Sequence, residues 1–113
     1  MKIKMIITAL LLSLSLTAAA QFKTIAEAYE VRISDVRLPQ SEVGTIGFKE
    51  CDDCDYQTRR VSEGTVYEFN GQRMSLEKFR RALAGVDRSQ NIPVQVLHHL
   101  ESNQVTKVWI LIP

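Results

Sequence analysis

The stretch that decides the fold runs from Thr65 to Gly85 and reads TVYEFNGQRMSLEKFRRALAG. Its first five residues are β-branched or aromatic except for Glu68, and this composition favours a strand. The following Asn70-Gly71 predicts a type I′ turn, because both central positions of that turn need a positive φ. The pattern therefore predicts a strand that reverses sharply into the next element.

A short helix is predicted directly after this turn, over about residues 76–84. Ser75 is placed to act as its N-cap and Gly85 as its C-cap. Three apolar residues share one face at helical spacing: Leu76, Phe79 and Leu83. That face is expected to pack inward, which leaves one amphipathic helix lying on a sheet.

The segments before this unit alternate apolar and polar residues. Residues 31–38, 44–48 and 56–61 are expected to be extended for that reason. Residues 22–29 differ, since their apolar side chains recur at helical spacing and indicate a short amphipathic start.

The segments after the unit predict a C-terminal β-hairpin, with strands near residues 94–100 and 105–112. The second of these strands is apolar on both faces, so we expect it at the centre of the sheet. The chain as a whole is predicted to be α+β. It should have a small, mostly antiparallel sheet, one helix (about 76–84) packed on one face, and the C-terminal hairpin.

The N-terminus has the three parts of a secretory signal peptide. Lys2 and Lys4 are followed by an apolar stretch over residues 6–16, and Ala18-Ala19-Ala20 precedes Gln21. The apolar stretch is much shorter than the ~20 residues that a transmembrane helix needs. Gln21 also stands where a bacterial lipoprotein would carry cysteine.

We therefore expect residues 1–20 to be cleaved and residues 21–113 to form one small domain, periplasmic or secreted, with no stable membrane anchor after cleavage. Without the leader and its two lysines, the chain has 93 residues, with 12 Lys/Arg against 13 Asp/Glu. This balance argues against a strongly basic nucleic-acid-binding protein, so no nucleic-acid partner is expected.

Cys51-Asp52-Asp53-Cys54 is the one motif in the chain that is suited to chemistry. The first interpretation is a local disulfide, because exported proteins meet an oxidising compartment. A four-residue turn holds its end Cα atoms within about 7 Å, which is compatible with disulfide geometry. Closing so short a loop stabilises the fold by only about 2 kcal/mol, so the bridge would fix one turn.

Other uses of the cysteine pair stay open. A metal site would combine Cys51 and Cys54 with His98 or His99, with carboxylates of the loop, or with a second copy of the chain. Successive side chains on a strand point to opposite faces, so both histidines cannot reach one metal. A thiol-redox site needs a lowered thiol pKa, which the flanking acidic residues disfavour. Haem attachment would require histidine where Asp55 stands.

The preferred function is a non-catalytic binding module of the cell envelope, since no nucleophile signature or phosphate-binding loop is present. Its partner would be an unidentified envelope protein or ligand, and no cofactor is expected. The acidic loop would make the contact through Asp52, Asp53 and Asp55. The alternative is a periplasmic metal-binding or thiol-redox protein that uses Cys51 and Cys54, and an enzyme is the least favoured class.

Two basic pairs, Arg59-Arg60 and Arg80-Arg81, are the remaining clusters of like charge. One interpretation is a patch for an anionic partner such as lipid headgroups. The simpler interpretation, which nearby glutamates favour, is a solvated face with balanced charge.

Overall fold

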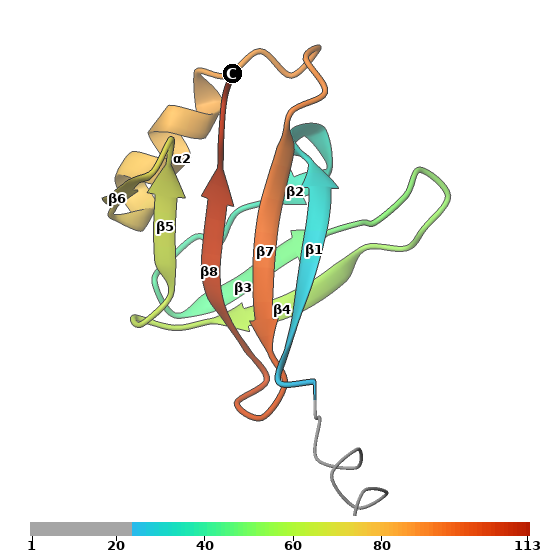
Figure 1. Cartoon of the computed structure of the whole chain (residues 1–113), viewed down its shortest axis with the longest axis vertical. Coiled ribbons are helices and arrows are strands. Elements are labelled where there is room, and N and C mark those ends of the chain that lie inside the picture. The colour runs from blue at the N-terminus through green and yellow to red at the C-terminus, as the bar shows by residue number, and fades with distance from the viewer. Residues whose placement is uncertain (1–23) are drawn as a thin grey trace, which may run out of the picture.

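The structure is a computed structural model that describes residues 24–113 (Figure 1). The predicted leader, residues 1–20, lies outside the described residues. The elements follow the order β1 (Ala26–Arg32), the 3₁₀ helix η2 (Ile33–Asp35), β2 (Val36–Arg37), β3 (Gly44–Phe48), β4 (Gln57–Val61), β5 (Val66–Phe69), β6 (Gln72–Met74), α2 (Leu76–Ala84), β7 (Pro93–His99) and β8 (Gln104–Ile110).

One eight-stranded sheet contains all of the described strands. Its main path is β1-β7-β8-β4-β3-β2, while β5 pairs with both β8 and β6. Strands that form hairpins, such as β7 and β8, pair antiparallel. In contrast, β8 runs parallel to β5, and it also pairs parallel with β4, where Gln104 lies opposite Arg60. The α+β prediction is confirmed, and β8 lies at the centre of the sheet as its apolar faces indicated.

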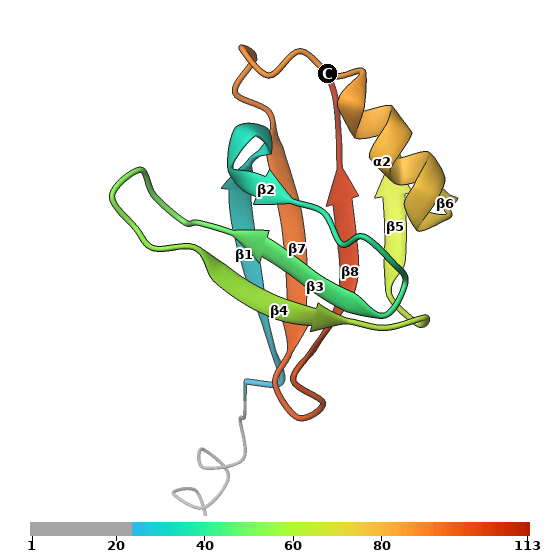
Figure 2. The ribbon, with the colours of Figure 1, turned by 180° about the vertical axis from the view of Figure 1, so that it is seen from behind.

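The sheet folds into two layers with the core between them. β1, β7, β8 and β5 form one layer, and β2, β3, β4 and α2 all lie on its same side (Figures 1 and 2). The buried side chains come from both layers: Val31, Ile33, Ile46, Phe48, Val61, Tyr67, Leu76, Phe79, Leu83, Ile92, Val94, Val96, Val105, Val108 and Ile110. Among the described elements, none covers the far face of the β1-β7-β8-β5 layer (Figure 1).

The unit around the Asn-Gly turn forms as its sequence predicts. Asn70 and Gly71 have φ values of 51° and 81°, which a type I′ turn requires. Ser75 Oγ accepts a hydrogen bond of 3.3 Å from the Lys78 N–H and caps α2, and Gly85 ends the helix. Within residues 24–113, no helix is long and apolar enough to cross a membrane.

The predicted helical start at residues 22–29 is wrong over the part that the structure describes. Residues Ala26–Arg32 instead form β1, which pairs with β7 from Ala26 opposite His99 to Arg32 opposite Pro93. Val31 is buried by this pairing. The cross-strand partners lie more than sixty residues away in the chain, so their contribution overrides the local helical spacing.

Candidate functional site

The loop between β3 and β4, residues 50–55, is called the hairpin tip below. It projects beyond β1, past the edge of the other layer (Figures 1 and 2). Cys51 and Cys54 form a disulfide across it, with their Cα atoms 5.0 Å apart. The Cys54 N–H also donates a hydrogen bond of 3.2 Å to the Cys51 carbonyl oxygen. The predicted local disulfide is confirmed, and it closes a single turn.

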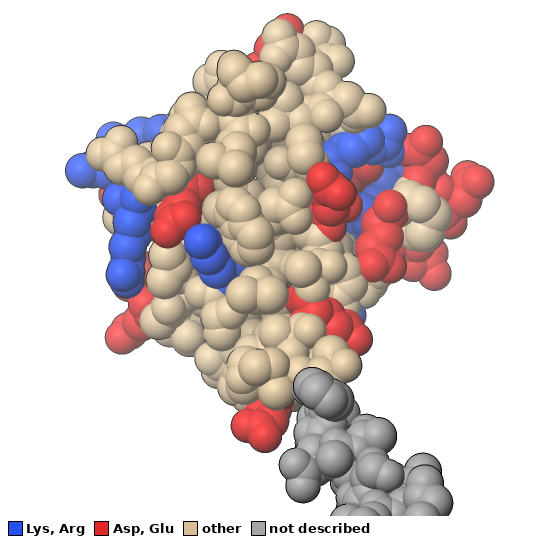
Figure 3. All heavy atoms as spheres, in the orientation of Figure 1, with Lys and Arg blue, Asp and Glu red and all other residues tan. Residues whose placement is uncertain are grey.

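The hairpin tip carries an unusual concentration of negative charge. Its four acidic residues are exposed: Glu50, Asp52, Asp53 and Asp55. They gather on the projecting end at the right of Figure 3. Within residues 24–113, Asp53 and Asp55 form no ion pair, and Glu50 accepts a hydrogen bond of 3.1 Å from Gln57 Nε2. The tip therefore presents carboxylates to solvent.

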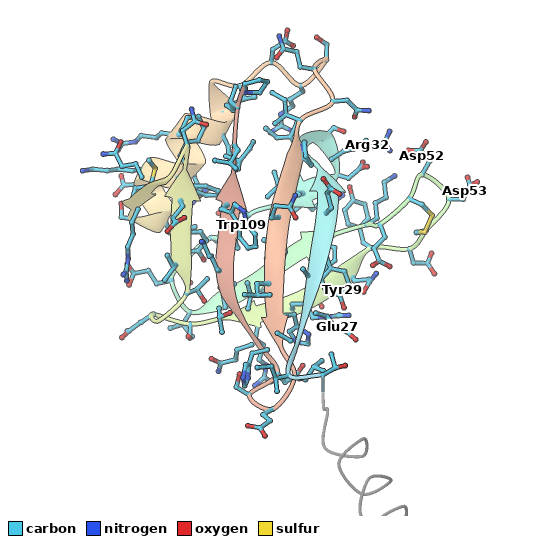
Figure 4. The ribbon with its side chains drawn as sticks, viewed as in Figure 1. Glu27, Tyr29, Arg32, Asp52, Asp53 and Trp109 are labelled. Atoms are coloured by element: carbon cyan, nitrogen blue, oxygen red, sulfur yellow. A yellow bond between two sulfur atoms is a disulfide. The ribbon has the colours of Figure 1, made fainter. Side chains whose placement is uncertain are left out.

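Arg32 links the hairpin tip to the body of the protein. Its guanidinium pairs with Asp52 on the tip and with Asp35 on η2, where Nη2 lies 2.8 Å from Oδ2. The Arg32 side chain extends from β1 toward Asp52 (Figure 4). Exposed ion pairs contribute only about 0–1 kcal/mol to stability, so the main effect of this link is to orient the tip.

Cationic side chains surround the base of the tip. The ring of Tyr56 lies under the Arg37 guanidinium, whose Cζ is 4.3 Å from the ring centroid. Lys49 Nζ lies 5.7 Å from the same centroid and 3.9 Å from Asp35 Oδ1. These cation–π and ion-pair contacts hold the base against β2 and η2, and they separate the acidic end from the core.

The histidines of the alternative metal site lie at the end of β7. His98 is 6% exposed, and its Nε2 is 3.0 Å from Asn103 Oδ1. His99 Nδ1 is 3.2 Å from Ser102 Oγ. In the described part of the chain, no group of three or more His, Cys, Asp or Glu residues could hold a metal ion. The structure therefore does not assemble Cys51 and Cys54 with either histidine.

The link through Arg32 is the part of this site that the sequence did not predict. Arg32 and Asp52 are twenty residues apart, and no local pattern joins a strand arginine to a loop carboxylate. Comparison with protein-family models, curated proteins and solved structures finds no match. Function has to be inferred from the geometry of this chain alone.

Proposed function

We propose that this protein is a non-catalytic binding module of an oxidising cell compartment, exported through residues 1–20, and that the hairpin tip contacts its partner. The observation that carries the proposal is the projecting acidic turn closed by the Cys51–Cys54 disulfide. Disulfides persist in the periplasm and outside the cell, so this bond supports such a compartment.

The covalent closure of the tip supports a role in binding. A flexible loop loses conformational freedom when it docks, and this loss weakens the complex. In the hairpin tip, the disulfide and the Arg32–Asp52 pair already restrict the loop before any partner arrives. The carboxylates of Asp53 and Asp55 are then displayed on a preorganised turn.

The charge of the tip indicates the chemistry of the partner surface. Thirteen acidic residues nearly balance fourteen basic ones in the whole chain, yet Glu50, Asp52, Asp53 and Asp55 fall within six residues. A basic patch on an envelope protein would complement them. Such complementarity chiefly raises the association rate and selects the partner, and salt screens it.

Affinity capture with matched charge variants tests the proposal. The tagged full chain, expressed with its own leader, is cross-linked in cells and recovered from the envelope fraction. Asp52→Asn with Asp53→Asn should reduce recovery of the specific partner by about tenfold, as loss of two interfacial charges does. Glu63→Gln with Glu101→Gln removes the same charge from exposed positions elsewhere and should leave recovery unchanged. Equal recovery with both double variants would contradict a role for the tip.

The state of the cysteines provides a second test. Alkylation of the exported protein without reductant, followed by intact-mass measurement, should detect no free thiol. Two alkylated cysteines would remove the covalent closure on which the proposal rests. The thiol-based alternative through Cys51 and Cys54 would then be preferred.

A further inference from the structure

A pocket on the covered side of the sheet has no part in the role proposed for the hairpin tip. It lies between the η2–β2 segment and α2, which occupy the same side of the β1-β7-β8-β5 layer (Figure 2), and has a volume of about 410 Å³. Ligand pockets in proteins typically span about 300–1,000 Å³. The cavity is therefore large enough for one small molecule.

Core side chains form the apolar floor of this pocket. Ile33 and Leu83 are 3% and 4% exposed, and the half-buried Leu38 lies beside them. The Ile33 N–H donates a hydrogen bond of 3.2 Å to the Ile92 carbonyl oxygen, so η2 is fixed to the segment before β7. An apolar chain lying on this floor would be removed from water on a preformed surface.

The rim of the pocket carries a single sign of charge. Arg37, Arg80 and Arg88 line it, and no acidic residue of the described chain does. The Arg37 guanidinium lies over the Tyr56 ring, so Arg80 and Arg88 are the two that offer their guanidinium groups to a ligand. None of the three forms an ion pair within residues 24–113. Three arginines without a carboxylate are notable in a chain whose acidic and basic totals differ by only one. A concave site lined by one sign of charge concentrates ligands of the opposite sign.

The acidic residues nearest in sequence are engaged elsewhere. Glu77 Oε1 pairs at 2.6 Å with Nη2 of Arg81, the neighbour of Arg80 that does not line the pocket. Asp87 Oδ1 accepts hydrogen bonds from the Ser89 N–H at 3.0 Å and from Ser89 Oγ at 2.8 Å. The guanidinium groups of Arg80 and Arg88 therefore keep their donors available.

We propose that this pocket, which we call the arginine pocket, binds a single-chain anionic amphiphile. The apolar chain lies on Ile33, Leu38 and Leu83, and a carboxylate or phosphate headgroup meets Arg80 and Arg88. Guanidinium groups bind both headgroups through paired N–H donors, which makes arginine better suited than lysine to this task. The concave shape holds one free molecule rather than a bilayer surface. This inference is independent of the role proposed for the hairpin tip.

Calorimetric titration of the purified full chain tests the ligand class. Decanoate and decyl phosphate, used below their micellar concentrations, should both bind with one site per chain. Decyltrimethylammonium has the same chain with the opposite charge, and its affinity should be at least about tenfold weaker because its headgroup meets Arg80 and Arg88. Equal affinity for the cationic and anionic compounds would overturn the proposal.

Two basic residues on α2, Arg80 and Lys78, provide matched variants. Arg80→Gln should weaken decanoate binding by about tenfold, the loss typical of one charge-assisted hydrogen-bonded pair. Lys78→Gln removes one positive charge from an exposed position on the same helix, outside the pocket, and leaves the Glu77–Arg81 pair intact, so it should leave affinity unchanged. Ala84→Glu, at an exposed position on the rim, should abolish binding by placing a carboxylate beside the headgroup. Circular dichroism confirms that each variant is folded.

Three results would exclude the proposed ligand. Equal weakening by Arg80→Gln and Lys78→Gln would show a nonspecific charge effect. Binding to phosphatidylglycerol vesicles without binding to monomeric decanoate would assign the arginines to a membrane surface. A dimer that Arg80→Gln dissociates would assign the pocket to a second copy of the chain. Asp52→Asn with Asp53→Asn should bind decanoate normally, so failure of this proposal is distinguishable from failure of the tip's proposed role.

Discussion

The hairpin tip and the arginine pocket lie on different sides of the molecule and are held in place by different forces. In Figure 2 the tip projects beyond β1, whereas α2, which forms one wall of the pocket, lies across the sheet from it. The tip has no residue in the core and depends on one disulfide and Arg32. The floor of the pocket belongs to the core. The chain is nearly neutral as a whole, yet its acidic and basic surfaces are separate. The disulfide fixes the acidic tip, and burial in the core fixes the floor of the arginine pocket.

The largest effect should come from the pocket floor. Leu83→Ala leaves a cavity under the pocket, and such changes cost about 2–5 kcal/mol of unfolding free energy. Leu83 is 4% exposed, so we expect a loss of about 3 kcal/mol in urea denaturation. Leu111→Ala, at a position that is 64% exposed, is the control and should cost less than about 0.5 kcal/mol. Similar small losses of unfolding free energy in both variants would contradict the assignment of Leu83 to a buried pocket floor.

The second-largest loss of stability should come from removing the disulfide that closes the hairpin tip. Cys51→Ser with Cys54→Ser removes the loop-closure constraint and should lower the free energy of unfolding by about 2 kcal/mol. The variant should stay folded and bind decanoate normally, because the core and pocket do not include the tip. Wild-type protein treated with reductant should show the same loss. A change as large as that of Leu83→Ala would mean that the tip supports the core.

Tyr67 makes the helix side of the molecule sensitive to alkaline pH. Its Oη is buried and has no hydrogen-bond partner in the described residues, and its ring packs 5.4 Å from that of Phe79 on α2. Burial, with a smaller contribution from the charge of Glu42, raises the pKa of Tyr67 from 10.0 to about 12. The unfolded chain therefore ionises first, and stability present below pH 10 is lost as pH rises toward 12.

Tyr67→Phe should remove this pH-dependent loss. At pH 7 the variant should differ from wild type by about 1 kcal/mol or less, since the deleted hydroxyl makes no hydrogen bond. Between pH 9 and about 11, denaturation midpoints should fall less for the variant than for wild type. Tyr56→Phe, at the exposed base of the tip, should follow the wild-type profile. Equal slopes for wild type and Tyr67→Phe would contradict the assignment.

The smallest effect should come from the ion pair that orients the tip. Asp52→Asn breaks the contact with Arg32, whose side chain is 42% exposed, while that of Asp52 is 76% exposed. Exposed pairs are worth about 0–1 kcal/mol, so thermal unfolding should shift by no more than a few degrees. Asp53→Asn, without an ion pair in the described chain, is the control. A loss matching that of the cysteine variant would show that Arg32 fixes the tip more strongly than exposure implies.

Local signals explain what the sequence could predict. The Asn70-Gly71 turn, the Ser75 cap and α2 depend on contacts within a few residues, and all three form as expected. The hairpin tip and its disulfide were predictable for the same reason, because Cys51 and Cys54 are three residues apart. The central position of β8 in the sheet was predictable because both faces of this strand are apolar.

Long-range contacts explain what the sequence could not predict. β1 is a strand because it pairs with β7, although its own spacing resembles a helix. The arginine pocket is lined by residues 33–40 on one side and residues 80–88 on the other, and no short window of sequence contains both. Considered with Arg81 alone, the sequence around Arg80 favours a solvated face. The place of Arg80 on the pocket rim depends on the position of η2 and β2 relative to α2.

The central place of β8 also sets the order in which the chain can fold. β7, β5 and β4 all pair with β8, whose residues are Gln104–Ile110. Until residues 104–110 have been synthesised, the layer that closes over the core lacks its middle strand, although β3 can already pair with β4 and β5 with β6. Sheets made by such distant contacts form late and slowly. The sheet therefore closes only when these residues near the C-terminus join it.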